Sequence, residues 1–455
     1  MEEKAGHLSR AWKTMADLTQ RVFPVAQEAQ GATVSTGRQR RESSNVGFGF
    51  LIAFFIVYCA RPEDWITPLA YLPLAKITAC GAMLALLTSG KRIRLSKLPR
   101  EFHYLVALVG VLVVSSVFSP VWKGGALVWT IDFAKIIIIF LLVYLLVTDL
   151  RRLRQLMFVQ AASLIVITAI SVVKGRHAPR LQGVIGGIFS NPNDLAFAIV
   201  LAIPFCMALL ITTKSMLGKL AWLLGILIML PALFLTQSRG GFIALLFAGT
   251  VVLWHFGVKG RRLYLIVGTA FVGVLLLATV GQKLMKRFEA ISDEAANFEA
   301  GYGSYEARKN LMILAVEGIE RYPILGIGPN DFMAYSKTWQ PVHMVYLQIG
   351  VEGGLIALFL YLAIFWRTFR NLRRLLKRKD LPQEYKIYAS AVHGSLVGFV
   401  VGALFAPVAY HYFPFFNVVY TSALIAMTES RQGMSVPASV PDWRQRRKAM
   451  NLGWI

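Results

Sequence analysis

The chain alternates between long apolar runs and short polar segments. A helix needs about 20 apolar residues to cross the hydrocarbon core of a membrane, and most of the runs approach that length. The pattern therefore predicts about twelve transmembrane helices, at roughly residues 46–60, 68–89, 104–121, 128–147, 155–173, 194–213, 217–235, 239–256, 263–281, 342–366, 388–406 and 413–429.

One connection is much longer than the others. Residues 282–341 are almost neutral, with 7 basic and 8 acidic side chains. Two sets of residues in this loop recur at helical spacing, namely Phe288, Ile291, Ala295 and Phe298, and then Leu311, Leu314, Gly318 and Tyr322. These patterns predict two amphipathic helices that lie on the membrane surface. Because loops of this length are usually functional, we expect this loop to have a functional role.

The composition agrees with a membrane protein. Of the 455 residues, 56% are hydrophobic and 16% are charged, whereas soluble domains carry about 25% charged residues. The formal net charge is +24, but the excess lies between the apolar runs, which argues against nucleic-acid binding and for basic cytoplasmic loops. The sequence thus predicts an all-α integral membrane protein.

The distribution of Lys and Arg predicts the orientation. Alternate segments, beginning with the N-terminus, hold 33 of the 48 basic residues, and segments rich in Lys and Arg stay in the cytoplasm. Both termini are then cytoplasmic and the long loop faces outward. The predicted parts are a cytoplasmic segment at residues 1–45, nine helices at 46–281 and an outward-facing loop at 282–341. Three helices at 342–429 and a cytoplasmic tail at 430–455 follow.

The sequence offers no pattern for a metal or a cofactor. Cys59, Cys80 and Cys206 all lie in apolar runs and build neither a disulfide framework nor a zinc site. Neither the phosphate-binding loop GxxxxGK[ST] nor the nucleophile motif GxSxG occurs. We therefore expect no metal and no cofactor.

Polar residues gather at the predicted outer ends of three helices. Helices that begin at 194, 239 and 342 would run inward, so their unpaired N–H groups and partial positive charge would suit a phosphate on the outside. Together with Arg308 of the long loop, the polar residues there are Arg180, Asn191, Asn193, Asp194, Gln237, Ser238, Arg239, His343 and Tyr346. Three arginines and one histidine are thus predicted to converge on the outer face.

These side chains have a chemical and a structural interpretation. The guanidinium fork of arginine holds a diphosphate through paired hydrogen bonds, but an arginine at a helix end can also reach lipid headgroups. The imidazole of His343 can take a proton from a hydroxyl group, or it can serve only as a polar cap. His411 is a weaker candidate of the same kind. Glu352 is interpreted as structural, and the spacing of Gly350 and Gly354 is typical of close helix packing.

Five short segments of the chain form one ordered set. They read IFSNPNDLA (188–196), TQSRGGFIAL (236–244), YEARKNLMILA (305–315), YPILGIGPNDF (322–332) and HMVYLQIGVEGGL (343–355). In this order, and with the long outer loop in the same place, they resemble the O-antigen ligase/polymerase superfamily of bacterial membrane proteins. Members of that family often have Asn directly after the histidine, whereas Met344 occupies that position here.

The resemblance implies a metal-independent, inverting glycosyltransferase in the bacterial inner membrane. Its donor would be an undecaprenyl diphosphate-linked glycan, used at the periplasmic face. By the matching positions, His343 would act as the base, and Arg180, Arg239 and Arg308 would bind the diphosphate. The accessory candidates of the outer cluster are Asn191, Asn193, Tyr346 and His411.

The acceptor is left open by these residues. The first hypothesis is an O-antigen ligase that transfers the glycan to lipid A–core. The alternatives are an O-antigen or exopolysaccharide polymerase and a protein O-oligosaccharyltransferase. A lipid-linked oligosaccharide transporter, the non-enzyme alternative, would favour charges through the membrane midplane, whereas here the polar residues gather on one face. The predicted partners are donor, acceptor and membrane lipids, without nucleic acid.

Overall fold

The structure, a computed structural model, describes residues 44–89, 95–175, 180–183, 189, 191–289, 302–338 and 340–435. Every regular element in these ranges is a helix, in agreement with the predicted all-α class. Seven of the described helices are long and apolar enough to cross a membrane. Most of the predicted end segments 1–45 and 430–455, and most of the helical pattern at 288–298, lie outside the described residues.

Each of the twelve predicted apolar runs coincides with a described helix. The seven candidate spans are α4 (Arg100–Val117), α5 (Lys123–Leu146), α6 (Leu150–Lys174), α7 (Pro192–Thr212), α8 (Met216–Leu235), α9 (Arg239–Leu253) continued by the π-helix η4 (Trp254–Val258), and α14 (Val345–Lys377). The others are Ser44–Ala60, α3 (Leu74–Thr88), α10 (Leu263–Glu289), α15 (Gln383–Gly402) and α16 (Tyr412–Ser435), with short 3-10 turns at Pro62–Asp64, Thr67–Tyr71 and Leu95–Lys97. The number of twelve spans stays a prediction.

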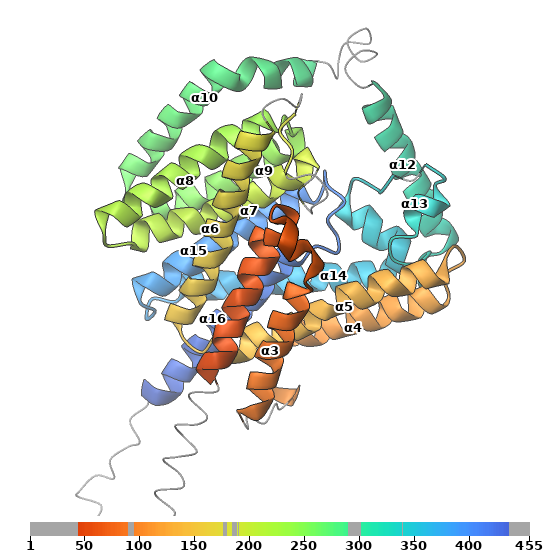
Figure 1. Cartoon of the computed structure of the whole chain (residues 1–455), viewed down its shortest axis with the longest axis horizontal. Coiled ribbons are helices and arrows are strands. Elements are labelled where there is room, and N and C mark those ends of the chain that lie inside the picture. The colour runs from red at the N-terminus through yellow and green to blue at the C-terminus, as the bar shows by residue number, and fades with distance from the viewer. Residues whose placement is uncertain are drawn as a thin grey trace, which may run out of the picture.

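Helix α15 packs against four other helices, α7, α9, α14 and α16 (Figure 1). Glycines let these helices approach closely, as is usual between helices in membranes. A Cβ on Gly402 of α15 would lie 1.8 Å from the ring of Phe197 in α7, and a Cβ on Gly394 would lie 2.6 Å from Val252 in α9. Larger residues at these positions would therefore push α15 away from both neighbours.

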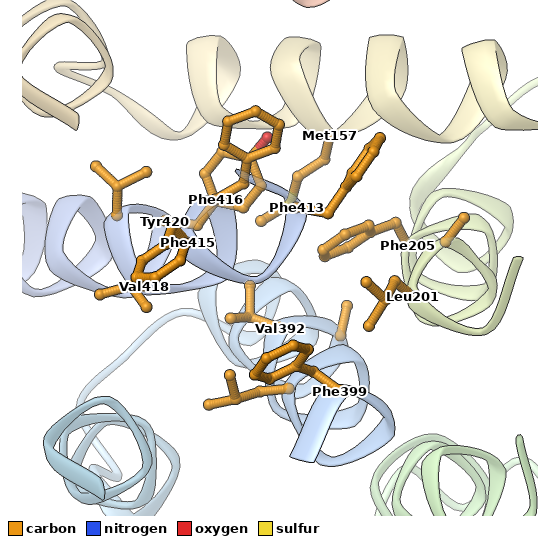
Figure 2. Close-up of a cluster of buried hydrophobic side chains, with 14 of the residues drawn as sticks. Met157, Leu201, Phe205, Val392, Phe399, Phe413, Phe415, Phe416, Val418 and Tyr420 are labelled. Atoms are coloured by element: carbon orange, nitrogen blue, oxygen red, sulfur yellow. The ribbon is translucent and has the colours of Figure 1, made fainter. Parts of the chain in front are cut away.

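The core around α15 and α16 is mainly aromatic (Figure 2). Lipid tails are as apolar as these side chains, so dispersion contacts, more than exclusion of water, hold such helices together. Tyr420 is fully buried and donates a hydrogen bond to Gln160 Oε1 of α6 at 2.9 Å. The labelled members of the cluster are Met157, Leu201, Phe205, Val392, Phe399, Phe413, Phe415, Phe416, Val418 and Tyr420.

Helix α14 is broken at Gly354. This residue has φ +75° and ψ 178°, a backbone region that is essentially restricted to glycine. A Cβ on Gly354 would lie 2.1 Å from Ile324 O, and the next N–H, that of Leu355, donates to Pro323 O at 2.8 Å. The interpretation of Gly350 and Gly354 as a pair for helix packing is therefore wrong for Gly354, which lets a loop enter the helix.

The loop at residues 322–331 fills this break with backbone hydrogen bonds. Ile327 N donates to Val351 O and Gly328 N donates to Glu352 O, both at 2.9 Å. The loop can approach so closely because it turns through left-handed positions, including Gly328 at φ +107°. The loop and α14 thus form one unit.

Helix α12 (Tyr302–Arg321) confirms the second helical pattern predicted in the long loop. Leu311 and Gly318 are buried, and a Cβ on Gly318 would lie 2.6 Å from Val351 of α14. A short helix, α13 (Phe332–Tyr335), completes a small second core with Leu311, Ile327 and Phe332. The predicted apolar face of α12 is therefore partly covered by protein, while Met312, Ile313 and Val316 of the same helix are exposed.

Gly354→Ala is expected to lower the free energy of unfolding by about 3 kcal/mol, at the upper end of the cost of a non-glycine residue in such a backbone region. Gly249→Ala in α9 is the matched control, because a Cβ at Gly249 meets nothing within 4 Å and alanine favours a helix. Thermal unfolding of the purified protein in detergent, followed by circular dichroism, measures both variants. Equal unfolding temperatures would contradict the role given to Gly354.

Candidate functional site

The N-termini of α7, α9 and α14 meet at the C-terminal end of α15. A Cβ on Gly241 of α9 would lie 2.8 Å from a side chain of α7, and a Cβ on Gly240 would lie 2.4 Å from Phe405, shortly after α15. At the same end of α15, Ala403 O accepts a hydrogen bond from Val345 N of α14 at 2.8 Å. The three helix ends that carry the predicted site residues therefore share one end of the bundle.

Arg239 is the first residue of α9 and follows a strained turn. Gln237 has φ +52°, in the left-handed region that few non-glycine residues adopt. The Ser238 hydroxyl caps α9 by accepting a hydrogen bond from Gly241 N at 3.2 Å. The turn and the cap together fix the position from which the Arg239 side chain extends.

Arg180 links this turn to the start of α7. Its Nε donates to Thr236 O at 3.0 Å, and its Nη2 donates to Asn193 Oδ1 at 3.2 Å. Asn191 caps α7 by accepting a hydrogen bond from Asn193 N at 2.9 Å. The structure thus brings Arg180, Asn191 and Asn193 together beside Arg239, while the binding of phosphate by these residues stays a prediction.

His343 lies two residues before α14 and is half-buried. Its Nδ1 lies 3.0 Å from Pro341 O. Because a carbonyl oxygen can only accept, Nδ1 carries the proton in this contact, and the neutral ring then presents Nε2 as an acceptor. This is the form of imidazole that can take a proton from a hydroxyl group.

Arg308 of α12 lies near enough to His343 to change its proton affinity. Burial lowers the pKa of His343, the positive charge of Arg308 lowers it further, and the hydrogen bond to Pro341 O opposes them. The combined effect lowers the pKa from its ordinary value of 6.5, which favours the neutral ring at pH 7. Two residues that are 35 positions apart in the sequence thus form one electrostatic unit.

The N-terminus of α14 differs from those of α7 and α9. Its N-cap residue is Met344, which provides no side-chain hydrogen bond to the first turn. Tyr346 donates its hydroxyl proton to Val400 O at 2.8 Å, so this residue fixes α14 against α15. The N–H of Val345 donates to Ala403 O, and the following N–H groups of the first turn, next to His343, have no side-chain cap.

His411 and Glu352 have other surroundings. Among the described residues, no hydrogen bond or ion pair joins His411 to His343, and burial lowers the pKa of His411 to about 4. Glu352 Oε2 accepts a hydrogen bond from the Tyr410 hydroxyl at 2.7 Å, and the Glu352 backbone carbonyl binds the loop at residues 322–331. These contacts agree with a structural role for Glu352.

Asp194 belongs to the predicted outer cluster, but the family resemblance implied no role for it. It lies in the first turn of α7, directly after Asn193. Its Oδ1 is buried and has no hydrogen-bond partner in the described part of the chain, which makes it a candidate acceptor for a ligand hydroxyl. Its position was visible in the sequence, but the lack of a partner was not. Within the described ranges, no three His, Cys, Asp or Glu side chains come together as metal ligands.

Comparisons with known proteins support a family resemblance for one part of the chain. A family model described as O-antigen ligase matches residues 224–362, which include Arg239, Arg308 and His343. No protein with a curated description matches the chain. A chain solved in work titled "Structural coordination of polymerization and crosslinking by a peptidoglycan synthase complex" shares 16% identity over 73% of this chain and 97% of its own length, with a TM-score of 0.42, a likeness too distant to support an argument. Residues 224–362 of the chain therefore contain a region that matches the O-antigen ligase family.

Proposed function

We propose that the protein is an O-antigen ligase that transfers a glycan from undecaprenyl diphosphate to lipid A–core at the periplasmic face of the inner membrane. The observation that carries the proposal is the electrostatic unit of His343 and Arg308 at the start of α14. A neutral base beside a permanent cation suits a reaction in which a hydroxyl loses a proton and a diphosphate leaves. Both residues lie within the domain matched by the family model.

The proposed reaction is a direct displacement without a metal ion. The acceptor hydroxyl oxygen forms a bond to the anomeric carbon, while the bond from that carbon to the diphosphate oxygen breaks. Nε2 of His343 takes the hydroxyl proton, and undecaprenyl diphosphate leaves with the bonding electron pair. Attack from the side opposite the leaving group inverts the anomeric configuration.

Arg239, Arg308 and the start of α14 would stabilise the leaving diphosphate. Guanidinium groups form paired hydrogen bonds with phosphate oxygens, and the uncapped N–H groups of α14 suit an anion. Arg180, which holds the turn before Arg239, would position this arginine and serve as a third phosphate ligand. The unpartnered oxygen of Asp194 would accept a hydroxyl of the donor glycan.

The acceptor distinguishes this ligase from a polymerase and from a protein glycosyltransferase, because one donor site would serve all three. We favour the ligase because the matching family model is described by that activity. Mass analysis of the glycans of a deletion strain tests the choice. Loss of ligation leaves full-length lipid-linked glycan to accumulate, whereas single repeat units on the surface would show that the protein is a polymerase.

His343→Ala is expected to slow transfer by about 10²- to 10⁴-fold, the usual contribution of a general base, with donor affinity nearly unchanged. His103→Ala is the matched control, because His103 is exposed and its Nδ1 lies 3.1 Å from a proline carbonyl, that of Pro99. Transfer is measured with purified protein, lipid-linked donor and lipid A–core. Full activity of His343→Ala would remove the histidine from the mechanism.

Arg239→Lys and Arg308→Lys are each expected to weaken donor binding about tenfold, since an ammonium group lacks the fork that binds two phosphate oxygens. Arg321→Lys, at the exposed end of α12, is the control. Native mass spectrometry with added undecaprenyl diphosphate measures the affinity. Unchanged affinity in both variants would indicate that these arginines only contact lipid headgroups.

The pH dependence of transfer should follow the protonation of His343. Because its pKa lies below 6.5, the base stays neutral, and kcat/KM is maintained, at pH values where an ordinary histidine is mostly protonated. Arg308→Gln removes a positive charge, so it should raise the pKa of His343 and move the loss of activity to higher pH, whereas Arg321→Gln should not. A ¹⁵N NMR titration of the ring measures this pKa without substrate, and identical titrations in the two variants would contradict the coupling.

A further inference from the structure

A polar cavity lies at the end of α14 that is remote from His343. Its volume is about 450 Å³, which is within the usual range of small-molecule sites. The start of α4, the second half of α14 and the second half of α16 line it. His343 precedes the break at Gly354, whereas Arg367 of this cavity lies well after it. None of the proposed site residues lines the cavity. The cavity is therefore separate from the proposed transfer site.

Cationic side chains dominate the lining. The lining contains two carboxylates, those of Glu101 and Glu429. It also contains five basic side chains, those of Lys97, Arg100, Arg367, Arg374 and Arg378. Arg378 is paired with Asp380, with its Nη2 2.5 Å from Oδ2. In the part of the chain that the structure describes, Lys97, Arg100 and Arg374 make no ion pair. Positive charge is thus in excess within the cavity.

One of the two carboxylates already has an ion-pair partner. Glu101 is only 2% exposed, and the Nε of Arg367 lies 3.0 Å from its Oε1. Asn371 Nδ2 donates a hydrogen bond to the same oxygen at 2.6 Å. A buried carboxylate needs such partners, so the Glu101–Arg367 pair is part of the structure. The remaining cations are left to bind another anion.

Two further features of the cavity suit a phosphate ester. Helix α4 begins at Arg100 after Pro99, which provides no side-chain cap, so the partial positive charge of this helix end adds to that of the side chains. Leu375 and Ile425 also line the cavity and can contact the carbon chain attached to a phosphate.

We propose that this cavity binds a phosphate group, carried either by an anionic phospholipid or by a soluble phosphate compound. Arginine forks match the oxygens of phosphate in geometry and charge. Residues of basic segments line the cavity, and the distribution of Lys and Arg predicts that these segments are cytoplasmic. Anionic lipid headgroups of the cytoplasmic leaflet attract such residues. The proposed ligand site and the proposed transfer site would then lie on opposite faces of the membrane.

The test compares two double variants of the full chain. Arg100→Gln/Arg374→Gln removes two lining cations and leaves the Glu101–Arg367 pair in place. Arg370→Gln/Lys377→Gln removes two exposed cations of α14 that do not line the cavity. In one arm, native mass spectrometry counts the phosphatidylglycerol retained from nanodiscs that also contain phosphatidylcholine. In the other arm, the delipidated protein in detergent is titrated calorimetrically with pyrophosphate.

Binding is expected to weaken about tenfold or more in the first variant, because charge-assisted hydrogen bonds are lost, and to change little in the second. Selective loss of phosphatidylglycerol in the first variant would support a lipid ligand. Selective loss of saturable pyrophosphate binding would support a soluble ligand. Absence of both kinds of binding in the unmodified protein, or equal weakening in the two variants, would overturn the proposal.

Discussion

Backbone hydrogen bonds between the loop at residues 322–331 and the break in α14 are the interaction on which the rest of the structure depends. Every N–H and C=O group inside a membrane needs a partner, and each one left without costs several kcal/mol. Gly354 interrupts the bonding pattern of α14, and Ile327 N and Gly328 N restore it by donating to Val351 O and Glu352 O. The broken helix and the loop therefore stabilise each other.

The same interaction places the two electrostatic partners of the candidate site. The loop follows directly after α12, and Gly318 lets α12 contact α14 at Val351, one turn from the break. Arg308 lies further back on α12, and His343 lies just before α14, so the docking of the loop sets the separation of Arg308 and His343. A change at the break would consequently act on the pKa of His343 without touching either residue.

Hydropathy located the helices because the thickness of the membrane sets their length. The alternation of charged segments also predicted that the starts of α7, α9 and α14 share one end of the bundle. The break at Gly354 could not be predicted, because a left-handed glycine within an apolar run leaves the hydropathy pattern unchanged. The partner of Glu352 was missed for a related reason. Tyr410 is 58 residues away in the sequence, and spacing alone does not reveal such contacts.

In the proposed mechanism, the charge of Arg308 acts differently before and after the donor binds. Without a donor it lowers the pKa of His343 and favours the neutral imidazole. A bound diphosphate would compensate the guanidinium and bring negative charge near the ring, which raises the pKa of His343. The base then gains proton affinity when the acceptor hydroxyl must lose its proton, and the imidazolium that forms lies beside the anionic leaving group. The pKa of a histidine far from any charge would not change in this way. Arg308 would therefore adjust the pKa of the base as well as bind the donor.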